Sequence, residues 1–136
     1  MKSEYFVSIN GSITTGENAK ISVFDRGFLY GDSVYESTRT FGTKVFRFDD
    51  HLERLFLSAK KIDLIPTISK NEIKSKTEEL INFSKLQDVS IRIILTRGTN
   101  DELGLDLKTA MHNNLVIMIK PVQELPLTTY ENGVPL

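Results

Sequence analysis

The densest group of chemically versatile side chains lies in residues 25–36, which read DRGFLYGDSVYE. Carboxylates, tyrosines and an arginine could bind anions or move protons there, and two glycines allow tight backbone turns. Such a segment can be a loop packed against a sheet, or a loop on a rigid sheet whose side chains carry function. The residue types alone leave both interpretations open.

Arginines outside this segment form the second group of candidates. Arg54 and Ser58 stand one turn apart on a predicted helix face, where a guanidinium could bind a phosphate or carboxylate through two hydrogen bonds. The alternative is a solvated helix face. Arg92 has apolar neighbours on a predicted strand, and a buried arginine would need a carboxylate, from a ligand or from the protein. Glu36 is one internal candidate.

Histidine and cysteine usage limits the possible chemistry. The chain has 2 histidines and no cysteine, which excludes a cysteine nucleophile, a disulfide and a cysteine zinc site. His51, in the first turn of a predicted helix, is expected to be solvated or locally hydrogen-bonded, and His112 to be unconstrained. No metal site is predicted. Gly27 and Gly31 are not followed by a helical pattern, so a nucleotide-binding glycine loop is not expected either.

Alternating apolar residues and turn signals predict the strands that must position these side chains. Asn10-Gly11 is typical of a two-residue hairpin turn, and Gly42-Thr43 predicts a second one. The predicted strands are 4–9, 12–15, 33–41, 44–48, 89–96 and 115–120.

Two helices are predicted between the second hairpin and the last strands. The first has Asp49 as its N-cap. Its apolar stripe is Leu52, Leu55, Phe56, Ala59 and Ile62, which follows helical spacing. The second runs over 71–85, with Ile73, Leu80, Ile81 and Thr77 on its buried face. The order of elements predicts an α+β fold, an antiparallel sheet packed against two helices.

Length and charge fit one ordinary domain. The chain has 136 residues with 17 Lys plus Arg and 18 Asp plus Glu, so no nucleic-acid partner is expected. Its apolar runs are too short to cross a bilayer and no signal peptide is recognisable, so a cytoplasmic protein is expected. We predict a small domain over residues 1–120. Residues 121–136 are expected to form an extended linker and the start of a missing larger domain.

Three motifs in order resemble the N-terminal half of the class IV aminotransferases, which are fold-type IV pyridoxal-phosphate enzymes. This family includes branched-chain aminotransferases, D-amino acid aminotransferases and 4-amino-4-deoxychorismate lyases. The resemblance covers residues 1 to 120. The motifs are 25–36, then 51–55 with Ser58, then 96–98 with 103–106.

The resemblance implies a role for individual residues. Arg54 would bind the phosphate of pyridoxal 5'-phosphate, in agreement with an anion site on the helix. Tyr30 would reach a substrate pocket shared between two subunits, which implies a homodimer. Tyr35, Arg39 and Arg92 would lie near the substrate, Arg92 toward its distal carboxylate.

Subfamily signals favour the branched-chain enzymes. D-amino acid enzymes carry an arginine and a histidine shortly after the Thr-Arg-Gly motif, where this chain has Glu102 and Gly104. The run 103–106 and Arg92 are similar to branched-chain enzymes, which predicts amino transfer from a branched-chain L-amino acid to 2-oxoglutarate.

The family's Schiff-base lysine has no counterpart in this chain. The resemblance places that lysine in a larger C-terminal domain, whereas Lys120, the last lysine here, belongs to a predicted strand. The chain alone is therefore expected to be inactive, as a truncated part of an aminotransferase. The alternatives are 4-amino-4-deoxychorismate lyase and a non-catalytic half-domain that associates with itself or another chain.

Overall fold

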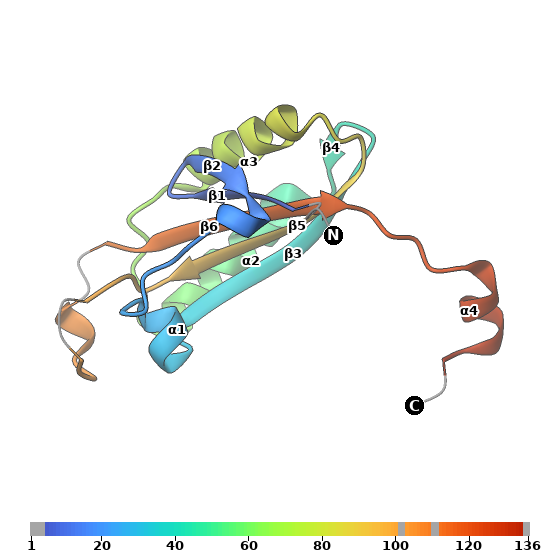
Figure 1. Cartoon of the computed structure of the whole chain (residues 1–136). Helices are drawn as coiled ribbons and strands as arrows, with labels where there is room; N and C mark the ends of the chain where they lie inside the picture. Colours follow the sequence, from blue (N-terminus) through green and yellow to red (C-terminus); the bar gives the residue numbers. More distant parts are fainter. Residues whose placement is uncertain (1–4, 101–102, 110–111, 135–136) are drawn as a thin grey trace.

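A six-stranded antiparallel sheet is the centre of the computed structural model, which describes residues 5–100, 103–109 and 112–134 (Figure 1). Its strand order is β2-β1-β6-β5-β3-β4. The elements are β1 (Phe6–Ile9), β2 (Ser12–Thr15), the 3-10 turn η1 (Gly16–Asn18), α1 (Arg26–Tyr30), β3 (Ser33–Phe41), β4 (Lys44–Val45), α2 (Phe48–Lys61), α3 (Lys70–Ser84), β5 (Val89–Thr96), the 3-10 turn η2 (Leu107–Thr109), β6 (Asn114–Pro121) and α4 (Leu127–Asn132).

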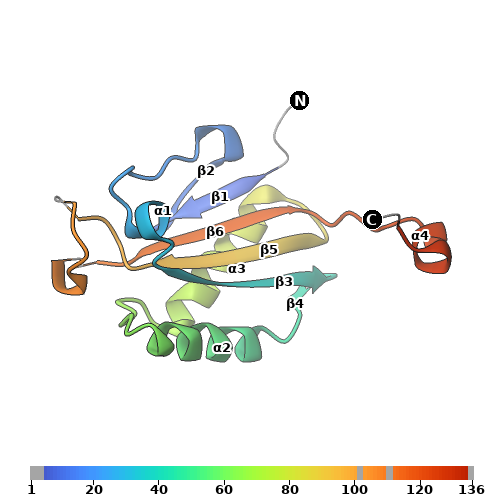
Figure 2. The same ribbon diagram turned by 90° about the horizontal axis from the view of Figure 1, so that it is seen from below.

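Helices α2 and α3 cover one face of the sheet (Figures 1 and 2). α2 packs along β3, and α3 packs over β1 and β6. The predicted α+β fold, an antiparallel sheet against two helices, is confirmed. The buried core between the layers consists of aliphatic side chains, among them Leu52, Leu55, Ala59, Ile73, Leu80, Ile91, Ile93, Leu95, Ile117 and Ile119.

Side chains alternate between the two faces along the central strands, as the pleat requires. In β5, Val89, Ile91, Ile93 and Leu95 are buried under the helices, while Arg92 between them is exposed on the opposite side. We call this opposite side the open face of the sheet. Its residues include Tyr35, Ser37 and Arg39 on β3, Ser90 and Arg92 on β5, and Met118 and Lys120 on β6.

The start of α2 differs from the prediction. Asp49 is not the N-cap: the helix begins at Phe48 after Arg47, which has a φ of 44° and no side-chain cap. β4 ends at Val45, so the predicted strand 44–48 is too long. Asp49 and Asp50 lie instead in the first helical turn, where negative charge favours the helix dipole.

The end of α2 and the start of α3 also differ from the bounds predicted from the sequence. Ile62, predicted on the buried stripe, caps α2 and is 36% exposed. α3 begins at Lys70, one residue before the predicted start. Ser69 accepts a hydrogen bond from the Glu72 backbone, and the Glu72 side chain accepts one from the Ser69 backbone. This capping box fixes the start of the helix.

A short helix lies where the sequence indicated only a loop. α1 spans Arg26–Tyr30, and the side chain of Asp25 accepts a hydrogen bond from the Gly27 N–H at 2.7 Å. Gly31 ends the helix at a φ of 66°, a conformation that favours glycine. Five residues are too few for a helical period to show in the sequence.

The sequence predicts an extended chain after β6, whereas the structure has the helix α4 within this segment. α4 stands away from the sheet and the other helices, and none of its residues is buried (Figure 1). Among the residues that the structure describes, no helix has the length and apolar character needed to span a membrane.

Candidate functional site

A buried carboxylate on β3 organises the first half of the candidate site. Glu36 is 5% exposed and faces α2. Arg54 donates from Nε to Oε1 and from Nη2 to Oε2, both at 2.6 Å. His51 Nδ1 donates to Oε2 at 2.9 Å, because a carboxylate can only accept. One carboxylate therefore fixes the orientation of both side chains.

The helical period explains why these two side chains meet Glu36 together. His51 and Arg54 are three residues apart and therefore lie on one face of α2. Leu52 and Leu55 point into the core instead and are fully buried. The predicted separation of Arg54 from the apolar stripe is confirmed.

Arg54 and Glu36 shift each other's pKa. Hydrogen bonds from Arg54, opposed by burial and assisted by His51, lower the pKa of Glu36. The hydrogen bond and charge of Glu36 in turn raise the pKa of Arg54. At neutral pH the carboxylate is ionised and the guanidinium is cationic.

Arg54 keeps part of its guanidinium available. Its side chain is 65% exposed, and Nη1 makes no hydrogen bond with the described residues, since both of its bonds run from Nε and Nη2. It lines a cavity of about 360 Å³ with Phe46, Arg47, Asp50 and His51. An immobilised guanidinium with a free donor at a cavity is suited to bind a phosphate or carboxylate.

A second cavity, of about 730 Å³, extends from this cluster over the open face. His51 and Phe46 line both cavities, so the two are adjacent. Arg39 and Arg92, two of the predicted substrate residues, line the larger cavity. The structure thus brings Arg54, Arg39 and Arg92 to neighbouring parts of one surface.

Arg92 does not pair with Glu36, which the sequence offered as one possible partner for a buried arginine. Glu36 is opposite Ile93 in the sheet register, whereas Arg92 is opposite Ser37. The two side chains therefore point to different faces. Arg92 donates from Nε to Ser37 Oγ at 3.3 Å and lies 5.2 Å from the ring centroid of Tyr35. As an exposed residue it needs no buried counter-charge.

The two predicted tyrosines occupy different places. Tyr35 is 63% exposed on the open face, in contact with Arg92. Tyr30 is 41% exposed at the end of α1, where the guanidinium of Arg26 lies 4.9 Å from its ring. Tyr30 lines neither of the two cavities around His51. Within one chain, the structure does not bring Tyr30 together with the other candidates.

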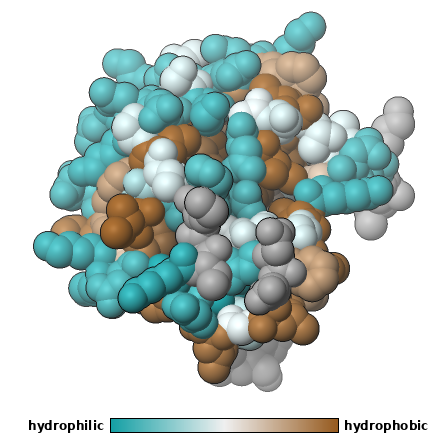
Figure 3. Space-filling model, turned by 90° about the vertical axis from the view of Figure 1, so that its left-hand side faces the viewer, coloured by the Kyte–Doolittle hydropathy of each residue, from teal (hydrophilic) through white to brown (hydrophobic). Residues whose placement is uncertain are grey.

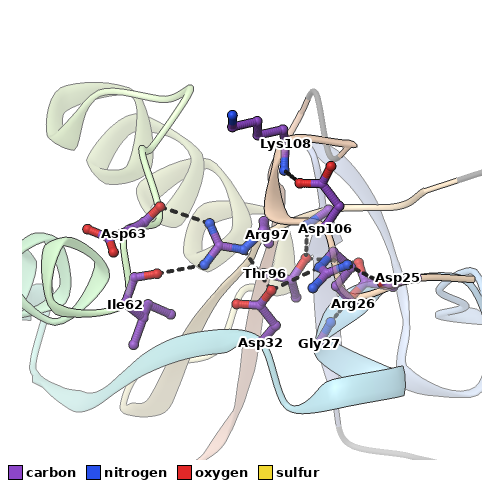
Figure 4. A network of polar contacts seen from close by, with 12 residues as sticks. Asp25, Arg26, Gly27, Asp32, Ile62, Asp63, Thr96, Arg97, Asp106 and Lys108 are labelled. Atoms are coloured by element: carbon purple, nitrogen blue, oxygen red, sulfur yellow. Dashed lines mark hydrogen bonds and ion pairs between the residues drawn. The ribbon is translucent and has the colours of Figure 1, made fainter.

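The density of charge in 25–36 has mainly an architectural explanation, shown in Figure 4. Asp32 accepts hydrogen bonds from Arg26 Nε at 2.9 Å and Arg97 Nε at 2.6 Å. The remaining bonds of these arginines go to main-chain carbonyls, from Arg26 to Gly104 and from Arg97 to Ile62 and Asp63. This network joins α1 to the end of α2 and to the segment around Gly104.

Asp25 completes the buried network. It is fully buried and accepts hydrogen bonds from Thr96 Oγ1 at 2.8 Å and Asn114 Nδ2 at 2.6 Å, besides the Gly27 N–H. These contacts connect the start of α1 with the ends of β5 and β6. Asp25 therefore stabilises the loop and is not available for chemistry.

Sequence reasoning missed the partnership of Glu36 with His51 and Arg54. A usable signal was present: Glu36 alternates with exposed Tyr35 and Ser37, which places it on the helix side of the strand. A carboxylate there requires a cation from the covering helix.

Comparison with known proteins shows the family of this chain. The family model of amino-transferase class IV matches residues 33–135. The chain belongs to the class IV aminotransferases. A putative branched-chain-amino-acid aminotransferase of Methanocaldococcus jannaschii is 39% identical over 100 residues, which are 74% of this chain and 34% of that protein.

Other members of the family are also similar. A D-alanine aminotransferase of Listeria monocytogenes is 34% identical over 95 residues, 70% of this chain and 33% of that protein. The crystal structure of a branched-chain aminotransferase from Thermoproteus uzoniensis, with norvaline, superposes with a TM-score of 0.77 at 27% identity. That match covers 88% of this chain and 41% of the solved chain. The chain spans about one third of the length of the two curated relatives.

Proposed function

We propose that this chain is the part of a pyridoxal-phosphate-dependent aminotransferase that binds the cofactor phosphate and one side of the substrate. The parent enzyme would transfer the amino group of a branched-chain L-amino acid to 2-oxoglutarate. Membership of the class IV aminotransferases supports the general activity. The observation that carries the assignment to this surface is the guanidinium of Arg54, held by Glu36 with Nη1 free.

The residues around Arg54 fit a phosphate. Arg54 offers Nη1, and His51 shares the carboxylate partner of Arg54 through its Nδ1. Both line the same cavity, and the raised pKa of Arg54 keeps its charge at any physiological pH. We propose Arg54 as the phosphate ligand, with Glu36 as the residue that positions it.

The cofactor would supply the electron sink that makes amino transfer possible. This chain's contribution is binding and orientation. The proton transfers need a Schiff-base lysine, and we propose that it lies in sequence outside these 136 residues. On the open face, Arg92 and Arg39 would orient the substrate, and Tyr35 would contact it beside Arg92.

A homodimer is part of the proposal, because Tyr30 lies outside the cavities lined by Arg39, Arg54 and Arg92. Apolar side chains of α1 and of the segment before it lie on the surface: Ile21, Val23, Phe24 and Phe28 are 44% to 65% exposed. Figure 3 shows hydrophobic patches at the end of the molecule that carries α1. A partner subunit would cover this segment and receive Tyr30 in its own substrate pocket.

The branched-chain assignment rests on two features. The putative branched-chain relative has 39% identity and the D-alanine relative 34%. In addition, Gly104 occupies one of the positions where D-amino acid enzymes carry a basic pair. The other position, Glu102, lies outside the described residues.

An activity assay of the protein produced from the native gene tests the proposal. We expect amino transfer from L-leucine to 2-oxoglutarate, no transfer from D-alanine, and roughly 10- to 100-fold weaker cofactor retention in Arg54→Ala. Lys60→Ala, at an exposed position of the same helix, is the control and should retain the cofactor. Pyruvate release from 4-amino-4-deoxychorismate without amino transfer would contradict the aminotransferase proposal and support lyase activity instead.

A further inference from the structure

The open face carries three cations in neighbouring positions of three strands. Arg39 on β3 is opposite Ser90 on β5, and Ser90 is opposite Lys120 on β6. Arg92 stands two residues from Ser90 on the same face of β5. Strands two apart are roughly 10 Å apart, so three long side chains from these positions can reach one small ligand.

Each of these cations has an aromatic neighbour, and no acidic side chain of the described residues pairs with any of them. Arg39 lies 4.3 Å from the ring centroid of Phe41, and Arg92 lies 5.2 Å from that of Tyr35. Lys120 lies 5.7 Å from the ring centroid of Tyr5. Within the described residues, none of the three forms an ion pair.

The cavity over these residues has a one-sided charge. Arg39, Arg92 and Lys120 all line the volume of about 730 Å³, and among the residues that the structure describes no aspartate or glutamate does. The remaining lining is aromatic, apolar or hydroxyl-bearing apart from His51. Three unpaired like charges repel one another in a chain whose net charge is -1, and a bound anion would relieve that repulsion.

We propose that Lys120 completes, with Arg39 and Arg92, a binding site for a small dicarboxylate on the open face. Lys120 is the residue that distinguishes a dicarboxylate from a monocarboxylate. A guanidinium binds one carboxylate through its planar fork, and the ammonium of Lys120, from the other side of Ser90, binds the second as a point charge. The inference rests on the proposed function only in naming this dicarboxylate as the amino-group acceptor.

The test uses the whole 136-residue chain and two acids of equal carbon number. Glutarate has two carboxylates and valerate has one, and neither carries a carbonyl that could react with lysine. In a nitrogen–proton NMR titration, we expect glutarate to shift the amide signals of Ser90, Arg92 and Met118 saturably. We expect valerate to bind at least roughly tenfold more weakly than glutarate.

Variants then assign the second carboxylate. Lys120→Met should weaken glutarate roughly tenfold and leave valerate within about twofold. Lys60→Met, on the exposed side of α2, should bind both acids as the unmodified chain does. Equal affinity for the two acids, an unchanged glutarate affinity in Lys120→Met, or equally tight binding of inorganic phosphate would overturn the proposal.

The outcome is separable from that of the proposed function. Amino transfer without any role of Lys120 in glutarate binding would refute only the dicarboxylate site. Saturable glutarate binding that depends on Lys120, in a protein that neither transfers amino groups nor retains the cofactor, would refute only the aminotransferase.

Discussion

Two carboxylates four residues apart, Asp32 directly before β3 and Glu36 within it, each bind arginine, yet with opposite outcomes. Asp32 binds Arg26 and Arg97, whose side chains are 3% and 7% exposed. Glu36 binds Arg54, whose side chain is 65% exposed. A count of ion pairs would treat the two clusters alike, whereas the exposure of the cations separates them.

The fate of the remaining N–H donors gives the chemical meaning of that difference. Around Asp32, the two arginines also donate hydrogen bonds to the main-chain carbonyl groups of Gly104, Ile62 and Asp63. Around Glu36, Nη1 of Arg54 has no such acceptor among the described residues. A closed cluster stabilises loops, and an open cluster can bind a ligand. This difference between the clusters leads to four predictions.

Removing the charge of Asp32 should have the largest effect. Asp32→Asn leaves two buried guanidinium groups without a counter-charge, so we expect the free energy of unfolding to fall by roughly 3 to 5 kcal/mol. Urea unfolding followed by circular dichroism measures it. A loss below about 1 kcal/mol would contradict the closed, structural role of this cluster.

Neutralising Glu36 should separate stability from binding. Glu36→Gln weakens the bonds that orient Arg54 and His51 at a buried acceptor, so we expect a loss of roughly 1 to 3 kcal/mol in unfolding free energy. In the folded fraction, phosphate binding should also weaken several-fold. Folded Asp32→Asn is the matched control and should bind phosphate normally. Equal loss of binding in both variants would remove the distinction between the clusters.

Acid should weaken both clusters. Burial tends to raise the pKa of Asp32, but the hydrogen bonds and charges of Arg97 and Arg26 outweigh it and lower that pKa. The pKa of Glu36 is lowered chiefly by Arg54. A carboxyl with a lowered folded-state pKa stabilises the fold above its ordinary pKa, and this contribution is lost as the pH falls below it.

The ordinary pKa values are 3.8 for Asp32 and 4.5 for Glu36. The free energy of unfolding should therefore decline from about pH 5 downward, and the gap between the unmodified chain and Asp32→Asn should narrow. Urea unfolding at a series of pH values measures both. A gap that stays constant down to about pH 2 would show that the Asp32 carboxylate contributes nothing through its charge.

An exposed pair provides the smallest effect. Arg47 and Asp50 form an ion pair with side chains 67% and 63% exposed. Arg47→Ala should change the unfolding free energy by less than about 0.5 kcal/mol, since solvent screens such pairs. A thermal or urea melt tests it. A loss comparable to that of Glu36→Gln would show that exposure does not rank these ion pairs.

The central part of the fold was accessible from the sequence because its signals are periodic. The strands 12–15, 33–41 and 89–96 have the predicted bounds, since alternation and turn dipeptides extend over many residues. The short helix α1 has too few residues for a period. The start of α2 depends on the left-handed backbone of Arg47. Arginine has no preference for that conformation, so the sequence did not predict it.

The site was predictable residue by residue but not as a set of contacts. Arg54 was recognised as an anion-binding candidate, and the structure gives it a free donor. Its partner Glu36 was considered only as one possible partner of a buried Arg92, because the sequence does not fix which cation a buried carboxylate meets across layers. Only the sheet register and the position of α2 decide that.

The most direct test of the account is whether Arg54 binds the phosphate of the cofactor. Pyridoxine 5'-phosphate, which has no aldehyde to react with lysine, can be titrated against the whole chain and followed by phosphorus NMR. We predict saturable binding, roughly tenfold or more weaker in Arg54→Ala and unchanged in Lys60→Ala. Equal affinity of the unmodified chain and Arg54→Ala would contradict the claim that Glu36 holds Arg54 for this purpose.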